Sequence, residues 1–141
     1  MHALSSYDYA LIRVVPSIER GECLNVGVIL FCRTRRFLGS LMDLDRSRLF
    51  AIAPDIDLEL IQEHLDHFEC VGAGGAHAGV LGELSQSERF HWLVSPRSTM
   101  IQTSPVHSGL CSDPDAALQR LLSTMVRLKG VSSVSSSRSA G

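Results

Sequence analysis

What this sequence lacks excludes several classes of protein. Its longest apolar run, residues 26–32, is far shorter than the roughly 20 residues that a membrane-spanning helix needs. Its first residues show no basic segment followed by an apolar one, so we expect no signal peptide. Its formal net charge is −2, whereas a protein that binds nucleic acid through phosphate contacts is normally basic. We therefore expect a cytoplasmic protein with no membrane association and no general affinity for nucleic acid.

Cysteine and histidine motifs for metal binding are also missing. The chain contains four cysteines, Cys23, Cys32, Cys70 and Cys111. No two are spaced as the CxxC pairs of zinc ribbons and thioredoxins, and Cys32 falls in an apolar run that predicts burial. His64 and His67 could meet on one side of a helix, but they form no HExxH motif. We therefore expect reduced thiols, no metal site and no cofactor.

The composition that is present is that of one globular domain. The chain has 141 residues, of which 45% are hydrophobic and 20% are charged. Residues 131–141 are Ser-rich and of low complexity, which predicts disorder. We expect a single domain over residues 1–130.

Three segments rich in β-branched and aromatic residues predict strands at 7–15, 24–32 and 37–42. Short loops join them, so we expect an antiparallel meander. A fourth strand is expected near residues 98–103, with residues 106–107 continuing it after a kink at Pro105. Asn25 and Gly27 are expected on the face of Ile29, and a glycine inside a strand indicates a bulge or a close approach of another group.

Helical patterns follow the meander. Apolar spacing predicts principal helices at residues 55–70, opened by Pro54-Asp55, and at 113–128, opened by Asp113-Pro114. Residues 45–53 predict a short helical turn, and 84–93 a shorter helix capped by Ser85 or Ser87. The glycine-rich residues 71–82 match no phosphate-binding motif and predict a flexible loop. The fold class is therefore α+β, a mainly antiparallel sheet with helices packed on it.

The segment 95–110 gathers the most hydrogen-bonding side chains around a short strand. A guanidinium, several hydroxyls and the start of the last helix have anion-binding character. With two polar residues of the first strands, the candidate ligand-binding residues are Arg13, Asn25, Arg97, Ser98, Thr99, Gln102, Ser104 and His107. The alternatives are structural: Arg13 extending to solvent at the sheet rim, and hydroxyls bonding to loop backbone.

The sequence does not assemble a catalytic set. Nucleophilic catalysis requires a Ser or Cys with a base in reach. Ser98, Ser104 and Ser108 are near His107 in sequence, but there is no GxSxG motif and the segment contains no paired carboxylates.

Longer motifs resemble a known family. They are YALIRVVP at residues 9–16, ERGE at 19–22, NVGVILF at 25–31, ERFHWL at 88–93, SPRST at 95–99, IQ at 101–102 and SPVHSG at 104–109. Together these resemble a bacterial family of uncharacterised proteins, domain of unknown function 3037, over about residues 7–128. The resemblance implies no particular activity. It suggests a protein partner, because members are encoded beside HipA-like serine kinase homologues in some bacteria.

Two hypotheses follow. The first is a small interaction module that works with another protein, such as a HipA-like kinase. The second is an enzyme or ligand-binding domain for a phosphorylated or nucleotide-like anion, which would use residues 97–107. Convergence of Arg13, Arg97 and His107 in one pocket would favour the second.

Overall fold

The computed structural model describes residues 3–96 and 100–127. Its strands are β1 (Ser5–Val14), β2 (Leu24–Cys32), β3 (Phe37–Met42), β4 (Ile101–Thr103) and β5 (His107–Cys111). Its helices are α1 (Arg46–Ile52), α2 (Leu58–Ala73), the 3-10 helix η1 (Ala76–Glu83), α3 (Gln86–Leu93) and α4 (Pro114–Met125). None of the helices in these two ranges is both long enough and apolar enough to span a membrane. The predicted Ser-rich tail, 131–141, lies outside the described residues.

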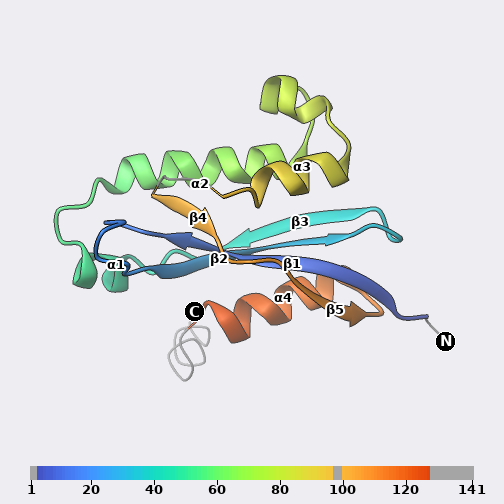
Figure 1. Ribbon diagram of the computed structural model, residues 1–141, viewed down its shortest axis with the longest axis horizontal. Helices are drawn as coiled ribbons and strands as arrows, with labels where there is room; N and C mark the ends of the chain where they lie inside the picture. Colours follow the sequence, from blue (N-terminus) through green and yellow to red (C-terminus); the bar gives the residue numbers. More distant parts are fainter. Residues whose placement is uncertain (1–2, 97–99, 128–141) are drawn as a thin grey trace, which may run out of the picture.

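The strands form one antiparallel sheet around β1 (Figure 1). β2 pairs with one edge of β1 and β3 pairs with β2, which confirms the predicted meander. Two short strands share the other edge of β1: β4 pairs with its C-terminal part and β5 with its N-terminal part. The predicted fourth strand is thus confirmed, and its predicted continuation after Pro105 extends to Cys111 as β5.

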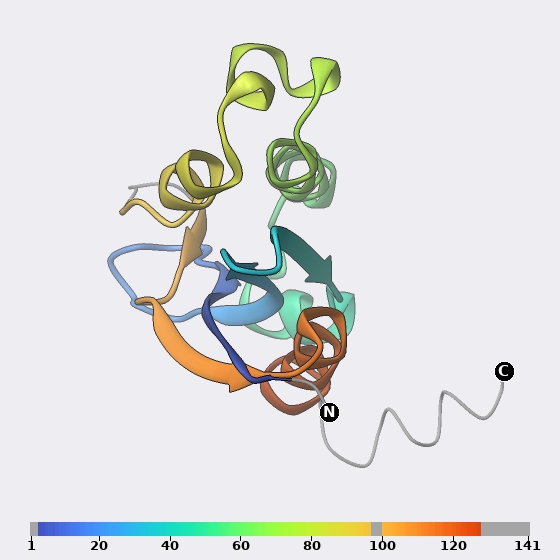
Figure 2. The same ribbon diagram turned by 90° about the vertical axis from the view of Figure 1, so that its right-hand side faces the viewer.

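Helices cover the sheet on two sides, with α2 and α3 above one face and α4 below the other (Figures 1 and 2). Successive side chains of β1 point to opposite faces of the sheet, so β1 contributes to the hydrophobic cluster on each face. Ala10, Ile12 and Val14 join the cluster under α2 and α3. Tyr7 joins the cluster on α4, and Tyr9 packs against that cluster. Both faces of β1 therefore bury apolar side chains.

Capping side chains fix the helix starts. Ser85 Oγ accepts a hydrogen bond from the backbone N–H of Glu88, and the Glu88 carboxylate accepts one from the N–H of Ser85. Hydrogen bonding of the Glu88 carboxyl to Ser85, above all to its backbone N–H, lowers the pKa of Glu88. At α4, Asp113 caps and Pro114 occupies the first turn. The predicted cap Asp113 is confirmed, and of the two candidates for α3 the cap is Ser85 rather than Ser87.

Two helix predictions need correction. α2 begins at Leu58 rather than 55, because Asp57 supplies the cap that Pro54-Asp55 was expected to give. The segment that precedes α2 forms a turn, in which the N–H of Ile56 donates a hydrogen bond to the carbonyl of Ala53. The predicted flexible loop at 71–82 is wrong as well. α2 continues to Ala73, Gly74 ends it at φ 78°, and η1 follows.

A β-bulge in β2 changes which side chains share a face. Ile12 pairs with Gly27, but Arg13 pairs with Asn25, so Val26 has no direct partner. This extra residue turns Asn25 to the face of Arg13, so the predicted position of Asn25 beside Ile29 is wrong. The close approach predicted at Gly27 is confirmed, since a Cβ there would lie 2.7 Å from the carbonyl oxygen of Leu41.

Candidate functional site

Three of the predicted site residues form one row across the sheet. Arg13 of β1 pairs with Asn25 of β2 on one side and with Gln102 of β4 on the other. Directly paired residues direct their side chains to the same face, which here is the face that α4 covers. Arg13 Nε donates a hydrogen bond to Asn25 Oδ1 at 3.2 Å. Residues that are far apart in sequence thus become neighbours, as a shared site would require.

This row is bonded to the last turn of α4. Asn25 Nδ2 donates a hydrogen bond to the carbonyl oxygen of Met125 at 3.3 Å. The last carbonyls of a helix have no partner within it and carry partial negative charge, which donors and cations stabilise. Arg13 and Asn25 therefore have a structural role, which is to hold the end of α4 against the sheet.

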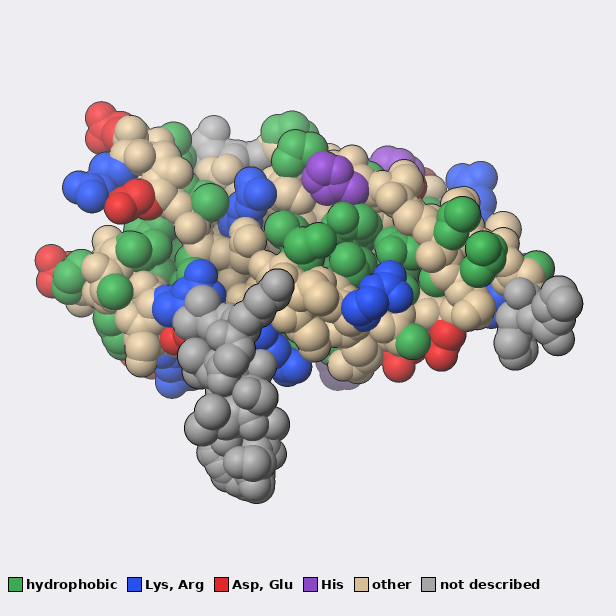
Figure 3. All heavy atoms as spheres, turned by 90° about the horizontal axis from the view of Figure 1, so that it is seen from below, with side chains coloured by type: hydrophobic (Ala, Val, Ile, Leu, Met, Phe, Trp, Pro, Cys, Tyr) green, Lys and Arg blue, Asp and Glu red, His purple; other side chains and the backbone are tan. Residues whose placement is uncertain are grey.

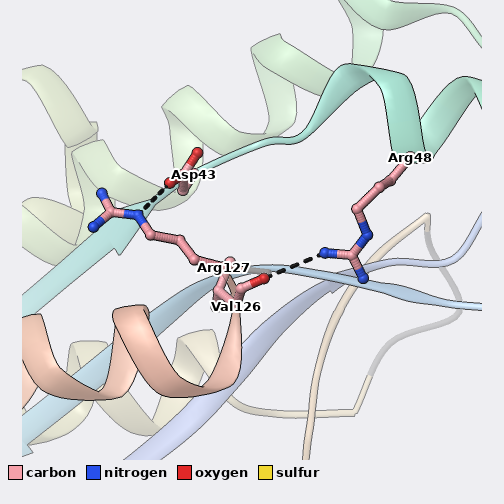
Figure 4. Close-up of polar contacts among 4 residues, drawn as sticks. All are labelled: Asp43, Arg48, Val126 and Arg127. Carbon is pink, nitrogen blue, oxygen red and sulfur yellow. Dashed lines mark hydrogen bonds and ion pairs between the residues drawn. The ribbon is translucent and has the colours of Figure 1, made fainter. Parts of the chain in front are cut away.

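Two further arginines fasten the same helix end (Figure 4). Arg48 Nη1 donates to the carbonyl oxygen of Val126 at 3.3 Å. Arg127 Nε forms an ion pair with Asp43 Oδ2 at 2.6 Å. Both contacts join α4 to the segment that follows β3, so the position of α4 is fixed by several independent bonds. Sequence reasoning missed these two arginines, because their partners are backbone or distant in sequence.

Ser104 is part of the sheet's hydrogen-bond ladder. The residue is 3% exposed, and its Oγ accepts a hydrogen bond from the N–H of Leu11 at 2.9 Å. Its own N–H donates to the carbonyl of Leu11 at 2.8 Å, and its Oγ donates to the carbonyl of Pro105. The hydroxyl thus fills the gap in pairing between β4 and β5.

His107 lies apart from the row. It pairs with Tyr9, and the centroids of the two rings are 5.6 Å apart. Arg13 is four residues further along β1, roughly 13 Å at the rise of a strand. The structure therefore does not bring His107 to Arg13. The predicted residues Arg97, Ser98 and Thr99 lie outside the described part of the chain, so their role stays a prediction.

The outer edge of β5 presents unpaired backbone groups. Leu11 directs its N–H and its carbonyl to Ser104, so odd-numbered residues in this part of β1 face the edge that β4 and β5 occupy. On β5, the residues paired with these odd-numbered residues direct their N–H and carbonyl groups toward β1. These residues are His107, Gly109 and Cys111. The intervening Ser108 and Leu110 point theirs outward, where no strand of the described residues pairs with them.

The sheet face beside this edge is partly open. α4 packs on β2 and β3, and Tyr9 and Leu11 of β1 remain half-buried. Figure 3, which views this side, shows hydrophobic side chains at the centre with histidine and basic side chains around them. Leu110 of β5 is 62% exposed. We call the outer edge of β5 together with Tyr9, Leu11 and His107 the β5 surface.

A cleft of about 340 Å³ lies elsewhere, and sequence reasoning missed it. It is lined by Ser6, Tyr7, Asp8, Phe31, Arg33, Ser87 and His91. They come from β1, from the end of β2 and from α3, so no short motif contains them. The available signals were the alternation that puts Ser6 and Asp8 on one face, and the spacing of Ser87 and His91 by one helical turn.

The cysteines and histidines of the described residues form no metal centre. All four cysteines are free, and Cys32 and Cys111 are buried. Burial raises the pKa of the Cys111 thiol, which disfavours the reactive thiolate. Within residues 3–96 and 100–127, no three His, Cys, Asp or Glu side chains are placed to hold a metal ion.

Comparison with known protein families matches residues 9–126 to the family described as protein of unknown function (DUF3037). Neither the curated proteins nor the solved structures contain a match. The match spans β1 from Tyr9 through α4, and so includes the row at Arg13, the β5 surface and most of the cleft. With most of its length matched, the chain belongs to the DUF3037 family.

Proposed function

We propose that this protein is an interaction module that binds an extended segment of a partner protein along β5. The observation that carries the proposal is the outer edge of β5, where Ser108 and Leu110 offer outward N–H and carbonyl groups with no partner strand in the described residues. A peptide that adds a strand to such an edge gains main-chain hydrogen bonds and places alternate side chains on the two faces.

The surroundings of β5 support an apolar segment as the occupant. On one face an added strand lies beside His107, close to the half-buried Tyr9 and Leu11. On the other face it lies beside Leu110, and Leu4, which directly precedes β1, is 64% exposed. Contiguous apolar surface of this kind is typical of interaction sites. Unoccupied edge strands are normally protected because they promote aggregation, and a bound partner would provide that protection.

A HipA-like kinase homologue is the first partner to test, since the family resemblance suggested it. The decisive pair of variants is Leu110→Pro and Leu110→Ala. Both remove the exposed side chain, but only proline removes the outward N–H. The bonds between β1 and β5 do not use this N–H, so both variants should fold.

Binding of the purified kinase homologue is measured by calorimetry, with thermal unfolding as the control for folding. We expect Leu110→Pro to bind roughly tenfold more weakly than Leu110→Ala, because one lost hydrogen bond is worth about that factor. Equal affinity of the two variants would reject β5 as the binding edge. Absence of binding by the wild-type protein would reject this partner.

A further inference from the structure

The cleft under α3 is distinct from the β5 surface, although its Asp8 is bonded to Ser108 of β5. It opens over the sheet face that α2 and α3 cover, whereas the open half of the β5 surface is on the α4 side. Phe90 of α3 stacks on Phe31 of β2 with centroids 5.4 Å apart, which fixes the helix above the sheet. The capping box at the start of α3 fixes its first turn. The walls of the cleft are therefore formed before any ligand arrives.

The cleft contains two opposite charges that do not pair with each other. Asp8 is opposite Phe31 in the sheet, and Arg33 follows Phe31 by two residues, so the charges occupy diagonal positions on one face. Asp8 Oδ1 accepts a hydrogen bond from Ser108 Oγ at 2.8 Å. The Arg33 guanidinium has no hydrogen bond or ion pair with any residue of the described ranges, and only the backbone carbonyl of Arg33 is bonded, to the N–H of Arg36. A carboxylate and a guanidinium thus both remain available to a ligand.

A third group, the His91 ring, has a defined proton arrangement. Its Nδ1 lies 2.7 Å from the carbonyl oxygen of Ser87. A carbonyl can only accept, so Nδ1 carries the hydrogen and Nε2 of the neutral ring is an acceptor. The cleft therefore offers two acceptors, Asp8 and His91 Nε2, and two donors, Arg33 and the hydroxyl of Ser6.

The donors and the acceptors are separated along the strands. Ser6 precedes Asp8 by two residues and Arg33 follows Phe31 by two, so continuing the antiparallel register places Ser6 and Arg33 in one row. Asp8 and Phe31 form the adjacent row. A ligand lying across both rows would meet donors at one end and a carboxylate at the other.

We propose that this cleft binds a small zwitterion with an amino group and a carboxylate, as a free α-amino acid has. The ammonium group donates to Asp8 and His91, and the ligand carboxylate accepts from Arg33 and Ser6. Both charged contacts are charge-assisted hydrogen bonds, which are the stronger kind. The volume of about 340 Å³ is at the lower end of small-molecule sites, which fits a ligand of this size.

The test uses the full chain and the free L-amino acids one at a time, by ligand-observed NMR followed by calorimetry. The best binder is then compared with its N-acetyl and its carboxamide derivatives. Both derivatives should bind at least roughly tenfold more weakly, since each loses one charge-assisted contact. Failure of every amino acid to bind at about 1 mM, the weak end of specific recognition, would overturn the proposal.

Variants assign each end of the ligand. Asp8→Asn keeps an oxygen that can accept the hydrogen bond from Ser108, so the variant should fold. It should bind the amino acid roughly tenfold more weakly than the wild type, and N-acetylation of the ligand should no longer reduce affinity. Arg33→Gln should likewise weaken binding of the free amino acid roughly tenfold, and it should then bind the carboxamide derivative as well as the free amino acid. Arg36→Gln is the matched control, because Arg36 belongs to the same β2–β3 connection but does not line the cleft. If Arg33→Gln binds as tightly as Arg36→Gln, the proposal is wrong.

Discussion

Replacing Ser104 by alanine tests whether this predicted site residue is structural. Its hydroxyl accepts a hydrogen bond from the N–H of Leu11 and the residue is 3% exposed, so alanine leaves that donor without its partner at a largely buried position. An unsatisfied buried donor costs roughly 1–3 kcal/mol. In a domain of this size that corresponds to a melting temperature lower by roughly 3–10 °C.

The assay is thermal and urea unfolding of Ser104→Ala beside Ser108→Ala. Ser108 is the matched control, because its hydroxyl also bonds across to β1 but at an exposed position. Its loss should change the free energy of unfolding by less than about 0.5 kcal/mol. If Ser104→Ala has the same melting temperature as Ser108→Ala and the wild type, the hydroxyl does not stabilise the sheet and the structural role of Ser104 is wrong.

Three other predictions concern the fold around these sites. Gly27→Ala should destabilise by about 1–3 kcal/mol in urea unfolding, because its Cβ would press on the backbone of β3. Asn25→Ala should cost about 0.5–1.5 kcal/mol by the same measurement, since it removes the bond to Met125. The pKa of Glu88 is lower in the folded protein than its ordinary value of 4.5, so its stabilisation is present above that pH and is lost as the pH falls through the lowered value. The difference in melting temperature between wild type and Glu88→Ala should therefore shrink on acidification; an unchanged difference would contradict the bond to Ser85.

Much of the fold could be predicted, because local patterns determine it. Strands 24–32 and 37–42 begin and end where turn residues interrupt apolar runs, and the structure has the same bounds. The start of α2 was misplaced because Asp55 and Asp57 are equally good caps in sequence, and only the turn at Ala53 decides between them. Gly27 indicated a bulge or a close approach, but only the pairing with β1 shows that Val26 is the extra residue.

The sites were harder to predict because their residues meet only through the tertiary fold. The polar residues Arg13 and Asn25 stood out inside apolar strands, and the structure does place them together. Their partner is the backbone of Met125, which no side-chain pattern can reveal. The cleft depends on α3 crossing the ends of β1 and β2, and that placement is a property of packing rather than of any one segment.

The measurement that tests the β5 proposal most directly is amide hydrogen exchange along β5, with and without the kinase homologue. In the free protein, the outward N–H groups of Ser108 and Leu110 should exchange fast, and those of His107 and Gly109 should be protected by β1. On binding, Ser108 and Leu110 should become protected while the other two stay as they were. Protection that appears elsewhere in the chain and leaves Ser108 and Leu110 exchanging fast would contradict strand addition at β5.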